Sequence, residues 1–230
     1  MLVLHGFTGS PFSVRGIAEA MANAGHSVEM PLLPGHGTAL EDMLPTTFAD
    51  WSAAAEAAFH SLASRTETVV IAGLSMGGTL TCWLAERHPE VAGIILVNPF
   101  VEPWNDEMVS GIQALADSGV EVLDAIGSDI SLQGVEERSY PGTPLKPLLS
   151  LVQGVEVTSA GLGDISCPVL LFSSTNDHVV APSNGEHLIA NVAGSVDQVV
   201  LDESFHVATL DVDADLIVTQ SVDFVERLAR

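Results

Sequence analysis

One serine in this sequence has the neighbours that a nucleophile requires. Ser75 lies at the centre of the pentapeptide GLSMG at residues 73–77, directly after the β-type run at 68–72. A serine on a sharp turn between a strand and a helix presents its hydroxyl above the edge of a sheet, where Cβ atoms on neighbouring residues would collide. Chance can supply such a pentapeptide, so the prediction that Ser75 is a nucleophile depends on its partners.

The partners of a nucleophilic serine are a base that takes its proton and an acid that orients the base. After a turn of this kind, the expected chain order is serine, acid, histidine. Asp177 is in the loop that follows the apolar run 169–173, and His206 follows the run 199–201. Asp177 could instead stabilise its own turn, and His206 could be an ordinary core or surface histidine. The chain order favours Asp177 as the acid and His206 as the base.

An attacked carbonyl also needs backbone N–H groups that stabilise its negative oxygen. The residue after the nucleophile, Met76, stands at the start of a predicted helix and supplies one donor. The glycine-flanked loop HGFTG at residues 5–9 follows the first strand and predicts Phe7 as the second donor. His36, in the turn PGHG at 34–37, is expected either to line the site or to have a purely structural role.

The other histidines and the cysteines are weaker candidates for chemistry. His5 is expected to order the adjacent loop, and His178 to point away from Asp177. Four histidines are expected to face solvent: His26, His60, His88 and His187. Cys82 and Cys167 are expected to be reduced thiols. Metal-ligand spacings and phosphate-binding loops are absent, so the sequence predicts neither a metal nor another cofactor.

Composition indicates a globular chain and excludes several partners. The chain has 230 residues, 47% of them hydrophobic, with 30 acidic against 7 basic residues and a net charge of -23. Such a charge repels nucleic acid and anionic surfaces, so a small neutral ligand is expected. No segment resembles a signal peptide or a membrane anchor, which makes the cytoplasm the expected location. The oligomeric state stays open.

Short apolar runs alternate with helical patterns, which indicates an α/β fold with a mainly parallel sheet. Strands are expected at 2–5, 26–30, 68–72, 94–97, 169–173 and 198–201, and helices at 10–24, 47–64, 76–88, 183–190 and 213–230. Residues 101–164 break this alternation without a clear strand. Amphipathic pieces at 107–126 and 146–157 predict a helical cap inserted between core segments 1–100 and 165–230. Its apolar residues, Leu148 and Val152 among them, are expected to line an acyl pocket or to be plain core.

Together, the segments LHGFTG, LPGHG, AGLSMGG and HVATLD resemble the α/β-hydrolase superfamily, and more narrowly its small bacterial carboxylesterases and monoacylglycerol lipases. The resemblance implies ester hydrolysis through an acyl-enzyme, no cofactor and a small helical cap. It assigns the nucleophile to Ser75, the acid to Asp177, the base to His206 and the oxyanion donors to Phe7 and Met76. Members of the family also carry N-terminal strands that are expected to be missing here.

Three hypotheses about function follow. The first is a serine esterase acting on short- to medium-chain esters or monoacylglycerols. The second keeps the triad and changes the bond, as in a thioesterase, a C–C bond hydrolase or a cofactor-free perhydrolase. The third is a ligand-binding protein on a hydrolase fold without chemistry, which a complete triad disfavours.

Overall fold

The computed structural model describes residues 1–125 and 127–229. Ile126 and Arg230 lie outside the described residues, and with them the last position of the expected helical segment 107–126 and of the expected helix 213–230.

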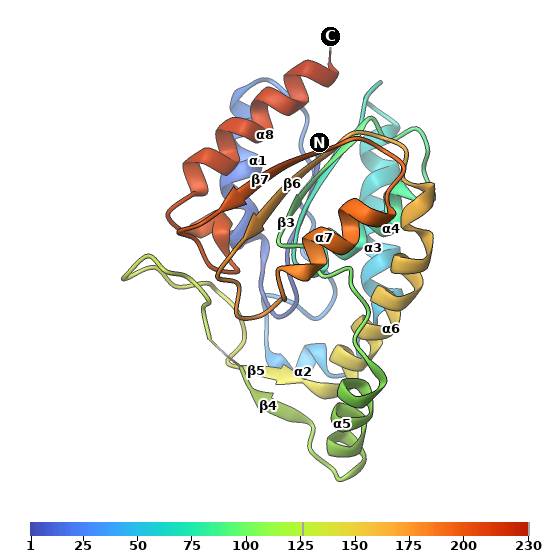
Figure 1. Ribbon diagram of the computed structural model, residues 1–230, viewed down its shortest axis with the longest axis vertical. Helices are drawn as coiled ribbons and strands as arrows, with labels where there is room; N and C mark the ends of the chain where they lie inside the picture. The colour runs from blue at the N-terminus through green and yellow to red at the C-terminus, as the bar shows by residue number, and fades with distance from the viewer. Residues whose placement is uncertain (126, 230) are drawn as a thin grey trace.

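A twisted parallel sheet forms the centre of the described chain, as the sequence predicts (Figure 1). Its strands lie in the order β1-β2-β3-β6-β7, and all neighbouring pairs run parallel. Their bounds are β1 Leu2–Leu4, β2 Val70–Leu74, β3 Gly93–Val97, β6 Val169–Ser174 and β7 Val196–Leu201. Every residue of β1, β2 and β3 is buried, because helices cover both faces of the sheet.

Helices pack on the two faces of this sheet and divide the core into two hydrophobic clusters (Figure 1). On one face lie α1 (Arg15–Asn23) and α8 (Ala214–Leu228). On the other lie α3 (Phe48–Ala63), α4 (Met76–Ala85), α6 (Leu145–Gly161) and α7 (Ser183–Asn191). The short helix α2 spans Leu40–Met43. Helix α4 begins directly after Ser75, so the sheet and α4 together position that serine.

Three expected elements differ from the structure. The segment 26–30 pairs with β1 only through an isolated bridge between Leu2 and Glu29, because Pro31 follows and has no N–H to extend the ladder. The helix expected at 10–24 begins as a 3₁₀ turn at Pro11–Val14 before α1. Helix α4 ends at Ala85 rather than at 88, since Pro89 disfavours helical geometry at the residue before it.

The insertion also contains a hairpin that the sequence did not predict. Strand β4 (Val122–Asp124) runs antiparallel to β5 (Gly142–Pro144), beyond helix α5 (Asp106–Asp117). These elements lie together below the carboxyl ends of the sheet strands in Figure 1. The strands are only three residues each, too short for a periodic pattern to reveal them.

Helix α6 joins the insertion to the core. Its residues Leu151, Val152 and Val155 belong to the same buried cluster as α3 and α4. We therefore propose that the cap extends from 101 to about 144 and that α6 is a shared wall, in place of a boundary at 164.

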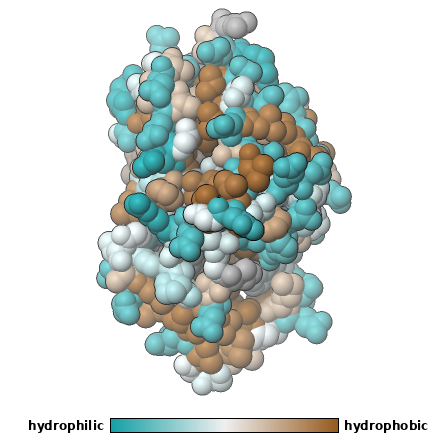
Figure 2. All heavy atoms as spheres, turned by 90° about the vertical axis from the view of Figure 1, so that its left-hand side faces the viewer, coloured by the Kyte–Doolittle hydropathy of each residue, from teal (hydrophilic) through white to brown (hydrophobic). Residues whose placement is uncertain are grey.

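The cap carries apolar side chains on its surface. Figure 2 shows them gathered at the lower end of the molecule, where Figure 1 places α5 and β4–β5. Met108 and Leu115 of α5 are 47% and 40% exposed. Among the described residues, none of the helices is both long enough and apolar enough to span a membrane.

Candidate active site

The backbone at Ser75 has the strained geometry that its neighbours predict. Ser75 has φ 56° and ψ -119°, a conformation that costs a non-glycine residue of the order of 1–3 kcal/mol. Its N–H donates to Val97 O of the neighbouring strand at 3.1 Å. A Cβ on Gly73 would overlap the Gly77 carbonyl, and one on Gly77 would overlap the Leu4 carbonyl. The two glycines therefore allow the turn to close against β1.

We expect Gly73→Ala to lower the free energy of unfolding by about 3 kcal/mol, because the added methyl meets backbone that cannot move aside. Gly111→Ala is the matched control, since a Cβ there meets nothing within 4 Å inside α5. It should raise stability by up to about 1 kcal/mol. Urea unfolding followed by circular dichroism checks both values, and equal effects at the two glycines would contradict the close packing of the turn.

Asp177 and His206 meet at the carboxyl ends of β6 and β7. His206 Nδ1 lies 2.7 Å from Asp177 Oδ2, and both side chains are buried, at 8% and 2% exposed. The other carboxylate oxygen, Oδ1, accepts the N–H groups of Val179 and Val180 at 2.9 and 2.8 Å. The carboxylate is therefore held from one side by its own loop while it contacts the imidazole from the other.

Two residues that sequence reasoning missed hold the loop carrying His206. Asn98, at φ 43° after β3, donates to His206 O at 2.8 Å and to Ser174 Oγ at 2.9 Å. Asp129, in the insertion, accepts the His206 N–H at 3.0 Å. Both are buried, so their polar groups need these partners. Neither lies in a motif. Asn98 could have been noticed as a polar residue directly after a predicted strand.

The loop after β1 approaches the nucleophile closely. A Cβ on Gly6 would lie 3.3 Å from Ser75 Cβ, and Thr8 takes a positive φ of 62°. In the described part of the chain, the N–H groups of Phe7 and Met76 have no hydrogen-bond partner. Met76 is the first residue of α4, where the helix dipole favours negative charge. Two unused donors thus flank Ser75.

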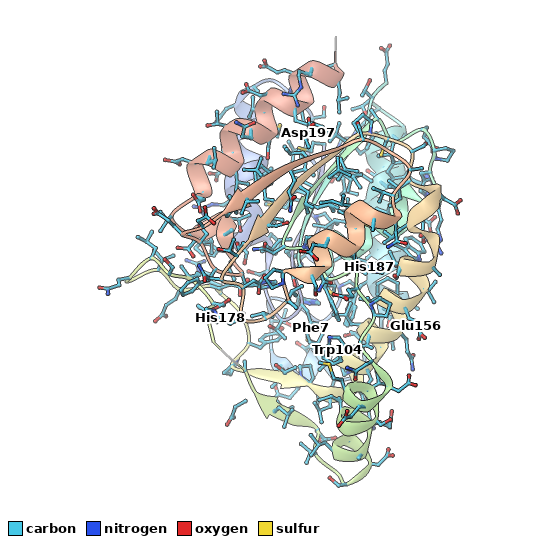
Figure 3. The ribbon with its side chains drawn as sticks, viewed as in Figure 1. Phe7, Trp104, Glu156, His178, His187 and Asp197 are labelled. Carbon is cyan, nitrogen blue, oxygen red and sulfur yellow. The ribbon has the colours of Figure 1, made fainter. Side chains whose placement is uncertain are left out.

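Ser75 and His206 line one cavity of about 600 Å³ between the sheet edge and the cap. Figure 3 shows Phe7 and Trp104 in this region, below the carboxyl ends of the strands, and both line the cavity. Leu148 and Leu151 of α6 contribute apolar wall. Val152, expected beside Leu148, is not among the residues that line the cavity; it lies one turn further along α6 and is buried in the core cluster.

His36 lies behind the cavity wall rather than in it. Its ring contacts Phe7 edge-on with centroids 6.4 Å apart, and its Nδ1 lies 3.0 Å from Pro34 O. His5 orders the same region, as expected, because its Nε2 accepts the Leu33 N–H at 3.2 Å. Burial lowers the pKa of His5 to about 3 and that of His36 to about 4. Both rings are therefore neutral at physiological pH and support the loop of Phe7.

Glu137 is one of three acidic residues that line the cavity, with Glu102 and Asp129, and sequence reasoning missed it. Its Oε1 accepts the Ser13 hydroxyl at 2.6 Å, and burial raises the pKa of its carboxyl. No motif surrounds Glu137 in the insertion, so the sequence had no signal for it.

The remaining expected residues have mixed outcomes. His178 turns to Asp129, with Nδ1 2.8 Å from Oδ1, and its side chain is 56% exposed. Of the four histidines expected to face solvent, His60 is exposed, but His26, His88 and His187 are partly buried, the last two against neighbouring helices. Cys82 and Cys167 are free thiols, and burial raises both pKa values, that of Cys167 to about 11.

Comparison with known proteins places this geometry in a family. The profile of the family described as serine aminopeptidase S33 matches residues 1–213. A thermostable monoacylglycerol lipase of Bacillus sp. (strain H-257) is 43% identical over 100% of this chain and 91% of its own length. The chain belongs to this α/β-hydrolase family. Its expected resemblance to small bacterial esterases and lipases is thereby confirmed.

Other α/β-hydrolases agree with this assignment. A carboxylesterase of Bacillus subtilis (strain 168) is 26% identical over 99% of this chain and 92% of its own length. A solved structure from work on the metagenome-derived lipolytic enzymes LipS and LipT superposes with a TM-score of 0.93 at 39% identity, covering 98% of this chain and 92% of that one. This α/β-hydrolase is therefore an enzyme of the carboxylesterase and monoacylglycerol lipase type.

Proposed function

We propose that this α/β-hydrolase cleaves short- to medium-chain carboxylic esters, monoacylglycerols among them, with Ser75 as nucleophile, His206 as base and Asp177 as orienting acid. The observation that carries the proposal is the buried 2.7 Å contact between His206 and Asp177 beside a cavity that Ser75 also lines. The similarity to a monoacylglycerol lipase and to lipolytic enzymes supports the ester as the bond that is cleaved.

In the first half of the reaction, His206 Nε2 takes the proton of Ser75 and the oxygen attacks the ester carbonyl. Asp177 keeps the proton on Nδ1, so Nε2 is the atom free to accept. The N–H groups of Phe7 and Met76 stabilise the oxyanion, each by about 3 kcal/mol. His206 then returns its proton to the leaving alcohol, and an acyl group stays on Ser75.

In the second half, water enters from the solvent side of the cavity and His206 takes one of its protons. The hydroxide attacks the acyl carbonyl, the oxyanion forms again in the same place, and Ser75 leaves with the proton from His206. The acid product departs and the enzyme regains its starting protonation state, so the cycle needs no cofactor.

The cavity has both the apolar surface and the hydrogen-bond acceptors that a monoacylglycerol requires. Leu148, Leu151 and the aromatic side chain of Trp104 offer apolar surface to an acyl chain. Glu137 offers carboxylate oxygens, which accept hydrogen bonds from hydroxyl groups such as those of a glyceryl head. A neutral substrate also avoids repulsion by the net charge of -23.

A substrate panel tests the proposal. We expect kcat/KM to be highest for monoacylglycerols and p-nitrophenyl esters of short to medium chain length, and at least tenfold lower for acyl thioesters and aminoacyl anilides. Glu137→Gln should raise KM for monoacylglycerols more than for p-nitrophenyl esters, because only the former present hydroxyl groups to it. Glu136→Gln, at the neighbouring position, is the control.

The panel also separates the alternatives. Preference for thioesters, for a β-diketone or for perhydrolysis would assign a different bond to the same triad, and preference for aminoacyl anilides would fit the peptidase description of the family profile. Folded protein without turnover of any member would favour a binding function and contradict the proposal.

A further inference from the structure

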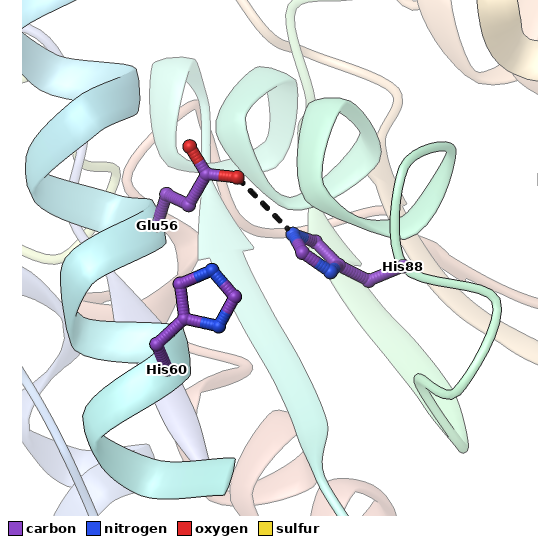
Figure 4. A group of neighbouring side chains, drawn as sticks. All are labelled: Glu56, His60 and His88. Atoms are coloured by element: carbon purple, nitrogen blue, oxygen red, sulfur yellow. Dashed lines mark ion pairs between the residues drawn. The ribbon is translucent and has the colours of Figure 1, made fainter.

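A cluster of three potential metal ligands lies on the surface away from the cavity. Glu56 and His60 project from the same face of α3, and His88 follows the end of α4 (Figure 4). One ligand atom from each of these side chains lies within 4.8 Å of the others. Glu56 and His60 are four residues apart, one helical turn, which brings their side chains to the same side of α3.

The ring of His88 is oriented as a metal-bound imidazole would be. Its Nδ1 lies 3.3 Å from Glu90 Oε1. An ionised carboxylate accepts hydrogen bonds and cannot donate them, so Glu90 favours a proton on Nδ1. Its Nε2 is buried without a hydrogen-bond partner and points at Glu56 Oε1. In metal-bound histidines, one ring nitrogen commonly binds the ion while the N–H of the other donates a hydrogen bond to a carboxylate.

The separation between His88 and Glu56 fits two ligands of one ion better than a direct hydrogen bond. His88 Nε2 and Glu56 Oε1 are 3.4 Å apart, beyond the 2.7–3.2 Å of a typical hydrogen bond. Two ligands about 2.0–2.1 Å from a tetrahedral zinc ion are about 3.3 Å apart. His60 is exposed, so its ring can close the remaining distance by a small rotation.

The nearby cation, Arg87, is paired with residues other than Glu56. Arg87 lies close enough to Glu56 to interact with it, but its guanidinium lies 4.2 Å over the Trp83 ring and pairs with Glu86. Glu56 thus keeps an oxygen directed at His88, with the ring of His60 beside them (Figure 4).

We propose that Glu56, His60 and His88 bind a divalent transition metal of the zinc class. Two imidazoles and one carboxylate are ligands that suit Zn²⁺ and Co²⁺, with water completing a tetrahedral site. The ion links α3 to the turn after α4, and so joins two helices that cover the same face of the sheet. Its role is to stabilise the fold.

This site lies far from the proposed chemistry. Ser75 precedes the first residue of α4, and His88 follows the last by three residues, so the ten-residue helix separates them by about 15 Å. Catalysis should therefore be indifferent to the ion. The sequence does not predict this metal site because the third ligand, His88, comes 28 positions after His60 and follows another helix. No short spacing pattern connects the three ligands.

Addition of Zn²⁺ to chelator-treated protein tests the site. We expect one equivalent to bind in isothermal titration and Tm to rise by about 5–10 °C at a hundredfold excess over Kd. The esterase kcat should stay within twofold. His60→Ala and Glu56→Gln should each weaken binding at least about tenfold and remove the rise in Tm, whereas His26→Ala, a histidine outside the cluster, should leave both unchanged.

Co²⁺ supplies a second readout that does not depend on stability. The Co²⁺-loaded wild type and His26→Ala should show the visible absorption of a four- or five-coordinate ion. His60→Ala should lack this absorption. Saturable binding that survives both ligand substitutions, or no binding by the wild type, would overturn the proposal. Either result leaves the esterase proposal standing, since activity is measured separately.

Discussion

Ser75→Ala is expected to lower kcat for p-nitrophenyl butyrate by about 10⁵–10⁶-fold. Alanine keeps the small side chain on the strained turn but removes the only oxygen that can form the acyl intermediate. The remaining activity should come from water activated by His206 beside the oxyanion donors. Stopped assays with high enzyme concentration measure the residual rate, and circular dichroism checks that the fold persists.

Ser166→Ala provides the matched control, because Ser166 is exposed and distant in sequence from the proposed triad. Its kcat should equal that of the wild type. A Ser75→Ala enzyme that retains kcat within tenfold would remove Ser75 from the mechanism and, with it, the acyl-enzyme.

Asp177→Asn is expected to lower kcat by about 10⁴-fold with little change in KM. The asparagine amide can present an N–H to His206 Nδ1, which then carries the lone pair and leaves the proton on Nε2. An imidazole in that tautomer cannot take the proton of Ser75. The Val179 and Val180 N–H groups still find a side-chain oxygen, so the loop should keep its conformation.

The pH dependence of the Asp177→Asn variant distinguishes this cause from simple unfolding. Hydroxide at high pH can replace the missing base, so the relative loss of kcat should shrink above the working pH. Asp202→Asn, an exposed carboxylate in the loop after β7, is the control and should change kcat less than twofold. Equal losses in the two variants would show that general charge, not contact with His206, sustains the rate.

The sequence could predict the parts of the site that obey local rules. Ser75 could be proposed as the nucleophile because its turn requires glycines at fixed positions, which leaves a short pattern between a strand and a helix. Asp177 and His206 could be proposed as its partners because each lies in the loop after a predicted strand, and strand ends meet at one edge of a parallel sheet. The central strands of the sheet followed from continuous apolar runs, which are typical of strands covered on both faces.

The contacts that depend on distant segments could not be predicted. Asp129 and Glu137 lie between the two short strands of the insertion, whose hairpin has no periodic pattern. Their place at the site depends on how this connection folds back against the core. The position of Val152 depended on which face of α6 meets the core, and an amphipathic pattern alone does not separate a cavity wall from a core wall. The Glu56–His60–His88 cluster likewise exists only after α3 packs beside α4.

Labelling with a fluorophosphonate tests the central claim most directly, because this probe reacts with a serine that a neighbouring base activates. Intact-protein mass spectrometry should show one adduct per chain, and peptide mapping should locate it on Ser75. Ser75→Ala should remain unlabelled, Asp177→Asn should react orders of magnitude more slowly, and Ser166→Ala should react like the wild type. A folded wild-type protein that stays unlabelled, or an adduct on another residue, would contradict the assignment of Ser75 as the nucleophile.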